Sequence, residues 1–118
     1  MYGFPPNIDL AFFVGEQLLQ LCARAHELIL NFDGGISVTE MSSIEYTAAD
    51  GARHAYTDFP RAVSAIAPLL NRVIVTARGE LRGTMVLEFE GGGRLEIPDD
   101  RDQYESFVIK HRNGLIVV

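Results

Sequence analysis

Two stretches of alternating hydrophobic and polar residues dominate the pattern of the chain. Residues 26–35 (HELILNFDGG) and 83–92 (GTMVLEFEGG) both end in a Gly-Gly pair, and their equivalent positions lie 57 residues apart. Apolar side chains at every second position are typical of a strand with one buried face. They are Leu28, Leu30 and Phe32 in the first stretch and Met85, Leu87 and Phe89 in the second. We therefore predict a duplicated strand and turn, with Phe32 and Phe89 buried at equivalent positions.

The remaining pattern predicts further strands and one helix. Strands are expected at 18–23, 27–32, 36–39, 44–47, 72–77, 84–90, 94–98, 107–110 and 115–118. Apolar residues between Phe59 and Leu70 have helical spacing, with Asp58 as the N-cap. Pro68 lacks a backbone N–H and should kink or restart this helix. Residues 48–53 are expected to form a surface loop, and residues 8–14 a short strand or edge segment.

These elements predict a single α+β domain over residues 1–118 that is mostly antiparallel β. Two pseudo-repeated hairpin halves, at about 10–47 and 72–118, are joined by one amphipathic helix at about 59–70. A chain of 118 residues is long enough to bury a core without disulfides or metals.

Charge and cysteine content narrow the classes of partner. The net charge is −6, and the ten basic residues are scattered, so no nucleic acid partner is expected. The lone Cys22 is expected to be a small buried thiol, and it fits a reducing cytoplasm because it has no partner for an internal disulfide. We find no basic leader segment and no apolar stretch of membrane-spanning length, which predicts a cytoplasmic protein with no membrane partner.

Several segments are distinctive together. They are residues 13–22 (FVGEQLLQLC), 26–32 (HELILNF), 67–71 (APLLN) and 99–111 (DDRDQYESFVIKH). In combination they resemble a family of small bacterial proteins of unknown function, over most of the chain from Leu10 onward. The resemblance implies a free-standing cytosolic domain, sometimes encoded near competition or defence systems. It implies no activity.

The densest polar cluster follows Pro98. It comprises Asp99, Asp100, Asp102, Tyr104 and Glu105. Carboxylates can hold a hard cation, but the glycine and the spacing of a calcium loop are missing, so no metal is expected. A solvated acidic turn and an acidic contact patch for a protein partner both remain open.

Histidines are the other candidates for chemistry. His26 opens one predicted strand and His111 ends another, and with Asp100 or Glu105 they can form a base and its orienting carboxylate. No serine or cysteine lies in a nucleophile turn, and residues 91–93 (GGG) lack the lysine of a phosphate loop. No cofactor is therefore expected.

The sequence favours a non-enzymatic protein-binding module, in its sharpest form an immunity-type protein that neutralises a toxin through its acidic charge. The alternative is a small enzyme or ligand-binding domain that uses His26, His111 and the acidic turn 99–105. The apolar segment 115–118 has no charged residue to protect a sheet edge, so it should be paired, either within the chain or in a homodimer.

Overall fold

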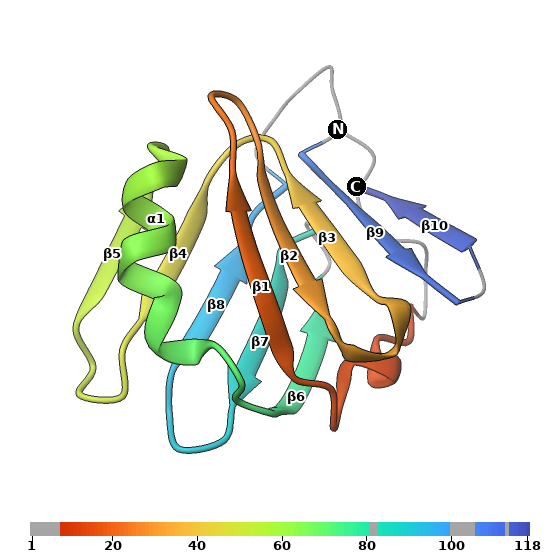
Figure 1. Ribbon diagram of the computed structural model, residues 1–118. Helices are drawn as coiled ribbons and strands as arrows, with labels where there is room; N and C mark the ends of the chain where they lie inside the picture. Colours follow the sequence, from red (N-terminus) through yellow and green to blue (C-terminus); the bar gives the residue numbers. More distant parts are fainter. Residues whose placement is uncertain (1–7, 81–82, 100–105, 113) are drawn as a thin grey trace.

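The computed structural model describes residues 8–80, 83–99, 106–112 and 114–118, which form two five-stranded antiparallel sheets (Figure 1). The first sheet has the order β1-β2-β3-β9-β10 and the second has the order β5-β4-β8-β7-β6. The strands of the first sheet are β1 (Leu18–Ala23), β2 (Leu28–Phe32), β3 (Ser37–Glu40), β9 (Phe107–His111) and β10 (Gly114–Val117). Those of the second are β4 (Ile44–Thr47), β5 (Arg53–Tyr56), β6 (Ile74–Gly79), β7 (Met85–Phe89) and β8 (Arg94–Ile97).

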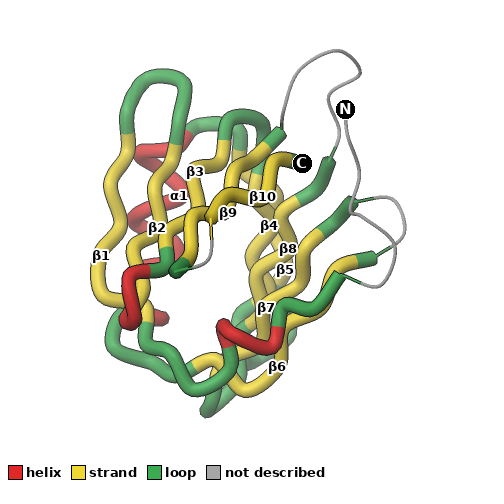
Figure 2. The backbone as a smooth tube through the Cα atoms, turned by 90° about the vertical axis from the view of Figure 1, so that its right-hand side faces the viewer, coloured by secondary structure: helices red, strands yellow, loops and turns green. Residues whose placement is uncertain are grey.

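The sheets form two layers around one core, and the chain passes between them twice (Figure 2). After β3 the chain enters β4, which pairs with β8 of the second sheet. After β8 it returns to β9, which pairs with β3 of the first sheet. The first half of the chain therefore contributes the hairpin β4–β5 to the second sheet, and the second half contributes the hairpin β9–β10 to the first sheet.

Alternation along the strands sets which side chains face the core. The apolar positions of β2 and β7 are buried, and Phe32 and Phe89 are 4% and 3% exposed. Phe32 pairs with Leu18, and Phe89 pairs with Ile74; in both cases the register shifts immediately after the pair. The predicted burial of both phenylalanines is confirmed.

The one α-helix among the described residues, α1 (Phe59–Ile66), connects β5 to β6. The carboxylate of Asp58 caps it by accepting a hydrogen bond from the N–H of Arg61 at 3.2 Å. Phe59, Ala62 and Ile66 form its buried face, which lies against β1, β4 and β5 (Figure 1). The helix ends before Pro68, and a 3-10 turn, η3 (Ala67–Leu69), follows as predicted.

Three local predictions were wrong. Residues 8–14 contain a 3-10 turn, η1 (Ala11–Phe13), in place of a strand, and Asp9 accepts a hydrogen bond from the N–H of Ala11 at 2.9 Å. Arg53 begins strand β5, although this segment is poor in apolar residues, because it pairs with β4 along the edge of the second sheet. Cys22 is only half-buried, since it pairs with the outward-facing Ile29.

The two sheets meet where β1 and β6 begin. Gln17 and Val73 form an isolated antiparallel bridge. The N–H of Leu18 donates to the C=O of Arg72 at 3.2 Å, and the N–H of Ile74 donates to the C=O of Glu16 at 2.9 Å. No helix among the described residues is long and apolar enough to cross a membrane.

Candidate functional site

The two sheets differ sharply on their outer faces. On the second sheet, ten side chains form two rows across the five strands, and six of them are charged. They are Ala55, Glu45, Glu96, Val86 and Arg78 in one row and Arg53, Thr47, Arg94, Glu88 and Thr76 in the other.

Ion pairs connect these charged side chains. Glu88 accepts hydrogen bonds from Thr76 Oγ1 at 2.7 Å and from Arg78 Nη1 at 3.3 Å. The Thr76 hydrogen bond and the nearby Arg78 charge hold the pKa of Glu88 below its usual value. Glu45 binds Arg53 and raises the pKa of that guanidinium. The charges of this face are therefore matched by ion pairs within the face.

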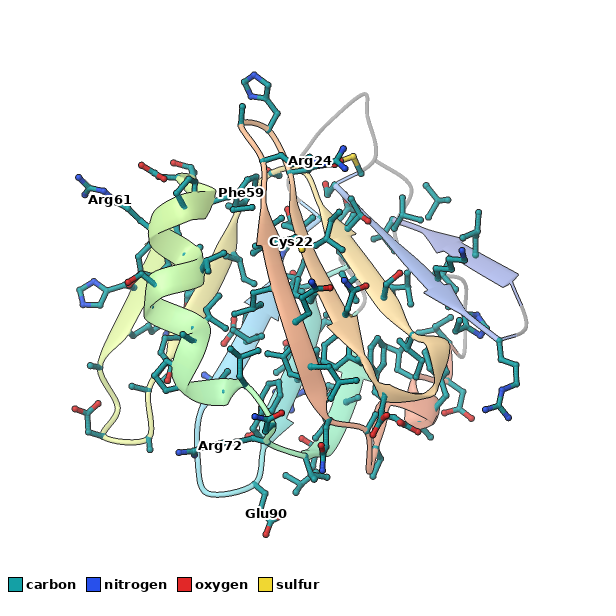
Figure 3. All side chains as sticks on the ribbon, viewed as in Figure 1. Cys22, Arg24, Phe59, Arg61, Arg72 and Glu90 are labelled. Atoms are coloured by element: carbon teal, nitrogen blue, oxygen red, sulfur yellow. The ribbon has the colours of Figure 1, made fainter. Side chains whose placement is uncertain are left out.

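The outer face of the first sheet is nearly free of charge. Its ten side chains, which we call the uncharged face, include one ionisable group that is charged at neutral pH, Lys110. The rows are Cys22, Ile29, Thr39, Val108 and Val117, and Gln20, Asn31, Ser37, Lys110 and Leu115. This face is toward the viewer in Figure 1, and Cys22 marks it in Figure 3.

Strand β10 forms one border of the uncharged face. Leu115 is 65% exposed and Val117 is 40% exposed. Phe107 and Val118 exchange two backbone hydrogen bonds, at 2.9 and 3.2 Å. Because such pairs alternate along an antiparallel ladder, Ile116 also bonds to β9, whereas the N–H and C=O groups of Leu115 and Val117 point away from the sheet.

The other sheet edges are protected in two ways. Strands β5 and β6 carry Arg53 and Arg78, and a charged side chain on an edge discourages pairing with another chain. Strand β1 has α1 packed beside it (Figure 1). Among the described edge strands, β10 has neither a charged side chain nor a helix packed beside it.

A cavity of about 600 Å³, which we call the end cavity, lies beside the turn between β9 and β10. Its apolar lining is Ile8, Phe12, Ile36 and Ile116, and its polar lining is Asp9, Glu16, His111 and Arg112, with Gly34. His111 stacks on Phe12, with ring centroids 4.5 Å apart and planes 17° apart. The predicted site residue His111 therefore lines a cavity of a size typical of small-ligand sites.

His26 lies elsewhere, in the turn between β1 and β2. It lines a more open depression with Arg24, Glu27 and Phe59. Arg24 and Phe59 are labelled in the upper part of Figure 3. Arg24 and Glu27 form an ion pair at 3.1 Å across this turn. The structure therefore does not bring His26 and His111 into one site.

The predicted acidic site is described only at Asp99, because Asp100, Asp102, Tyr104 and Glu105 lie outside the described residues. Asp99 is 9% exposed and accepts a hydrogen bond from Ser106 Oγ at 3.0 Å. This carboxylate is therefore buried, which differs from the solvated turn considered from the sequence. Its burial accompanies that of Ser106, which is fully buried.

The sequence reasoning missed one buried carboxylate. Glu40 is 0% exposed, and its Oε1 accepts hydrogen bonds from the N–H groups of Ser42 and Ser43 at 2.6 and 2.9 Å. An acidic residue followed by two serines at a strand end is the signal for such a side-chain-capped turn. The interaction supports the turn between β3 and β4.

No family model, curated protein or solved structure matches the chain. The family resemblance drawn from the sequence stays a prediction. Within the described residues, no group of three or more His, Cys, Asp and Glu side chains is placed to hold a metal ion.

Proposed function

We propose that this chain is a protein-binding module, that strand β10 is its binding element, and that a second copy of the chain is the protein bound there. The single observation that carries the proposal is the exposed apolar edge. Leu115 and Val117 present both apolar side chains and outward-pointing backbone groups. A strand added antiparallel to β10 would satisfy those groups and cover those side chains.

Charge favours a second copy at this edge. Two chains of net charge −6 repel each other, so they associate best where neither carries carboxylates. Strands β9 and β10 contain no acidic residue, and the uncharged face continues from them across the sheet. Lys110 remains in solvent when the contact is edge to edge, so no unpaired charge is buried.

The size of the contact sets its strength. A strand of four residues with two exposed apolar side chains offers far less than the roughly 800 Å² per partner of a standard interface. We therefore expect a weak dimer, with a Kd of about 10 µM to 1 mM. The two-fold axis would join the two first sheets into one continuous sheet.

We propose in addition that the chain consists of two repeats offset by 56 or 57 residues. Hydrogen bonds at matching positions support this. The N–H of Asp33 donates to the C=O of Gln17 at 2.9 Å. The N–H of Glu90 donates to the C=O of Val73 at 2.8 Å. In the strand order, β5 lies at the edge of the second sheet where β10 lies at the edge of the first, and of the two, only β5 carries an arginine.

The test uses two valines that sit on different edge strands. Val117 on β10 is 40% exposed and Val75 on β6 is 47% exposed, so Val117→Lys and Val75→Lys add the same charge at similar exposure. Light scattering over roughly 1 µM to 1 mM should show the mass of the unmodified chain rising from 13.1 kDa toward twice that value. Val117→Lys should keep the mass at that of the monomer, and Val75→Lys should not.

Two results would overturn the proposal. One is a mass that stays monomeric across the whole range. The other is a dimer that survives Val117→Lys in a variant whose thermal unfolding shows it to be folded. The immunity-type role stays a prediction, because these features concern where a protein binds and not which toxin is neutralised. The separate locations of His26 and His111 give no support to an enzyme built on both.

A further inference from the structure

We infer that the end cavity binds a small zwitterion with an apolar side chain, such as an apolar α-amino acid or a short peptide of such residues. The inference is independent of self-association, because the cavity faces the interior side of β10 through Ile116 and not its outer face. It rests on the apolar lining of the cavity and on two side chains of opposite charge, Glu16 and Arg112, that form no ion pair with the described residues.

The apolar part of the cavity is preformed. Phe12 packs on Phe13, with ring centroids 4.8 Å apart, and it also stacks with His111. Ile36 is 5% exposed, so its position is fixed by the core. A side chain of leucine or phenylalanine size has only to displace solvent from these surfaces, which favours its binding.

Both charges lie beside one turn. This turn, η2 (Asp33–Gly35), joins β2 to β3 and contacts β9. Ser37 pairs with Lys110, so continuing the ladder brings the turn opposite Arg112. The Glu16 carboxylate lies against the same turn, since a Cβ atom built on Gly34 would be 3.1 Å from its Oε2.

Neither charge has a partner within the described part of the chain. None of the ion pairs there includes Glu16 or Arg112. Asp9 also lines the cavity; its Oδ1 accepts the N–H of Ala11, and its negative charge adds to that of Glu16 in favouring a ligand ammonium. A ligand carboxylate suits the planar guanidinium of Arg112, and a ligand ammonium suits Glu16.

Arg72, near the start of β6, provides a matched control for the charged residues of the end cavity. Arg72 lies over Gly91 much as Glu16 lies over Gly34, because a Cβ atom built on Gly91 would be 3.0 Å from Arg72 Nη1. The hollow there is lined by Asn71, Val73 and Glu90, with no aromatic, leucine or isoleucine side chain in its lining. Arg72 and Glu90 are labelled in Figure 3. Arg72→Gln therefore changes a similar charge without touching the end cavity.

The experiment is calorimetric titration of the full chain with L-phenylalanine, and separately with the dipeptide Leu-Phe. We expect saturable binding of L-phenylalanine with a Kd of about 0.1–1 mM for a ligand of this size. Glu16→Gln and Arg112→Gln should each weaken it about 10- to 100-fold, as expected for loss of a charged hydrogen bond. Arg72→Gln should leave it unchanged. Tighter binding of the dipeptide with the same dependence on Glu16 and Arg112 would identify a peptide as the ligand.

Ligand derivatives keep the test decisive if a variant fails to fold. N-acetyl-phenylalanine lacks the ammonium and phenylalanine amide lacks the carboxylate, so both should bind the unmodified chain at least about tenfold more weakly. The inference is overturned if L-phenylalanine shows no saturable binding below about 10 mM. It is also overturned if the two derivatives bind as well as L-phenylalanine does, or if folded Glu16→Gln and Arg112→Gln bind it normally.

Discussion

Removing either core phenylalanine tests how the two sheets share their interior. Phe32 and Phe89 end β2 and β7, and both are almost fully buried. Their cross-strand partners, Leu18 and Ile74, are also buried. Phe32→Ala and Phe89→Ala therefore make comparable cavities on the two sides of one core.

The magnitude follows from the area lost. A buried phenylalanine covers about 150–250 Å², which corresponds to about 4–6 kcal/mol at about 25 cal/mol per Å². Alanine retains part of this area, so each substitution should lower the free energy of unfolding by about 3–5 kcal/mol. Phe32 also meets Phe13 edge to face, with centroids 5.5 Å apart and planes at 79°. That geometry adds about 0.5–1.5 kcal/mol, so we expect Phe32→Ala to cost more than Phe89→Ala by about this amount.

Equilibrium urea denaturation at neutral pH measures both losses, and a double-mutant cycle with Phe13→Leu isolates the ring contact. A loss below about 0.5 kcal/mol for either variant would be typical of a surface position and would refute the shared-core reasoning. A smaller loss for Phe32→Ala than for Phe89→Ala would refute the contribution of the edge-to-face pair.

Two further predictions concern backbone strain and pH. Gly93→Ala should lower the free energy of unfolding, measured by urea denaturation, by about 1–3 kcal/mol more than Gly15→Ala does. Both glycines have positive φ, but of the two only Gly93 has a side chain close by, because a Cβ atom there would be 2.7 Å from Leu69 Cδ2. Equal losses for the two variants would contradict this prediction. The pKa of Glu88 is lowered from its ordinary 4.5 in the folded chain, so ionised Glu88 stabilises the fold above about pH 4.5. This stabilisation is lost as the pH falls through the lowered pKa of the folded chain. Glu88→Gln should therefore lower the free energy of unfolding at pH 7 and have a smaller effect near pH 3; an equal effect at both pH values would contradict the shift.

Much of the fold was predictable because apolar residues recur at every second position of the inner strands. In β2 the buried and half-buried residues alternate, and in β7 Met85, Leu87 and Phe89 form the core face although the outward-facing Val86 is also buried, so the period of two identifies the core face. The helix was predictable for a similar reason, and its end at Pro68 follows from the missing N–H.

The last strand shows where periodicity fails. Residues 115–118 are all apolar, so the sequence does not distinguish inward from outward positions. The structure places Val118 in the core and leaves Leu115 exposed, because pairing with β9 sets the register. The sequence pattern did not predict strand β5 for the opposite reason, since this strand has too few apolar residues to be recognised.

The candidate sites depend on contacts that are distant in sequence. The end cavity combines residues around Phe12, Gly34 and His111, which no local motif connects. The local cluster of carboxylates at residues 99–105 instead predicted a site there, and the one of these carboxylates that is described, Asp99, is buried and bonded to Ser106. The pairing of β3 with β9 brings Arg112 to the turn at residues 33–35, and the Glu16 carboxylate lies against Gly34 of the same turn.

Hydrogen exchange at β10 tests the proposed binding element most directly. In a single chain the amide of Ile116 is bonded to β9, whereas the amides of Leu115 and Val117 point outward. Amide exchange measured by NMR at low and high protein concentration should show protection of Leu115 and Val117 that rises with concentration, while that of Ile116 changes little. Exchange at Leu115 and Val117 that stays fast at every concentration would contradict the proposal that a second copy pairs with this strand.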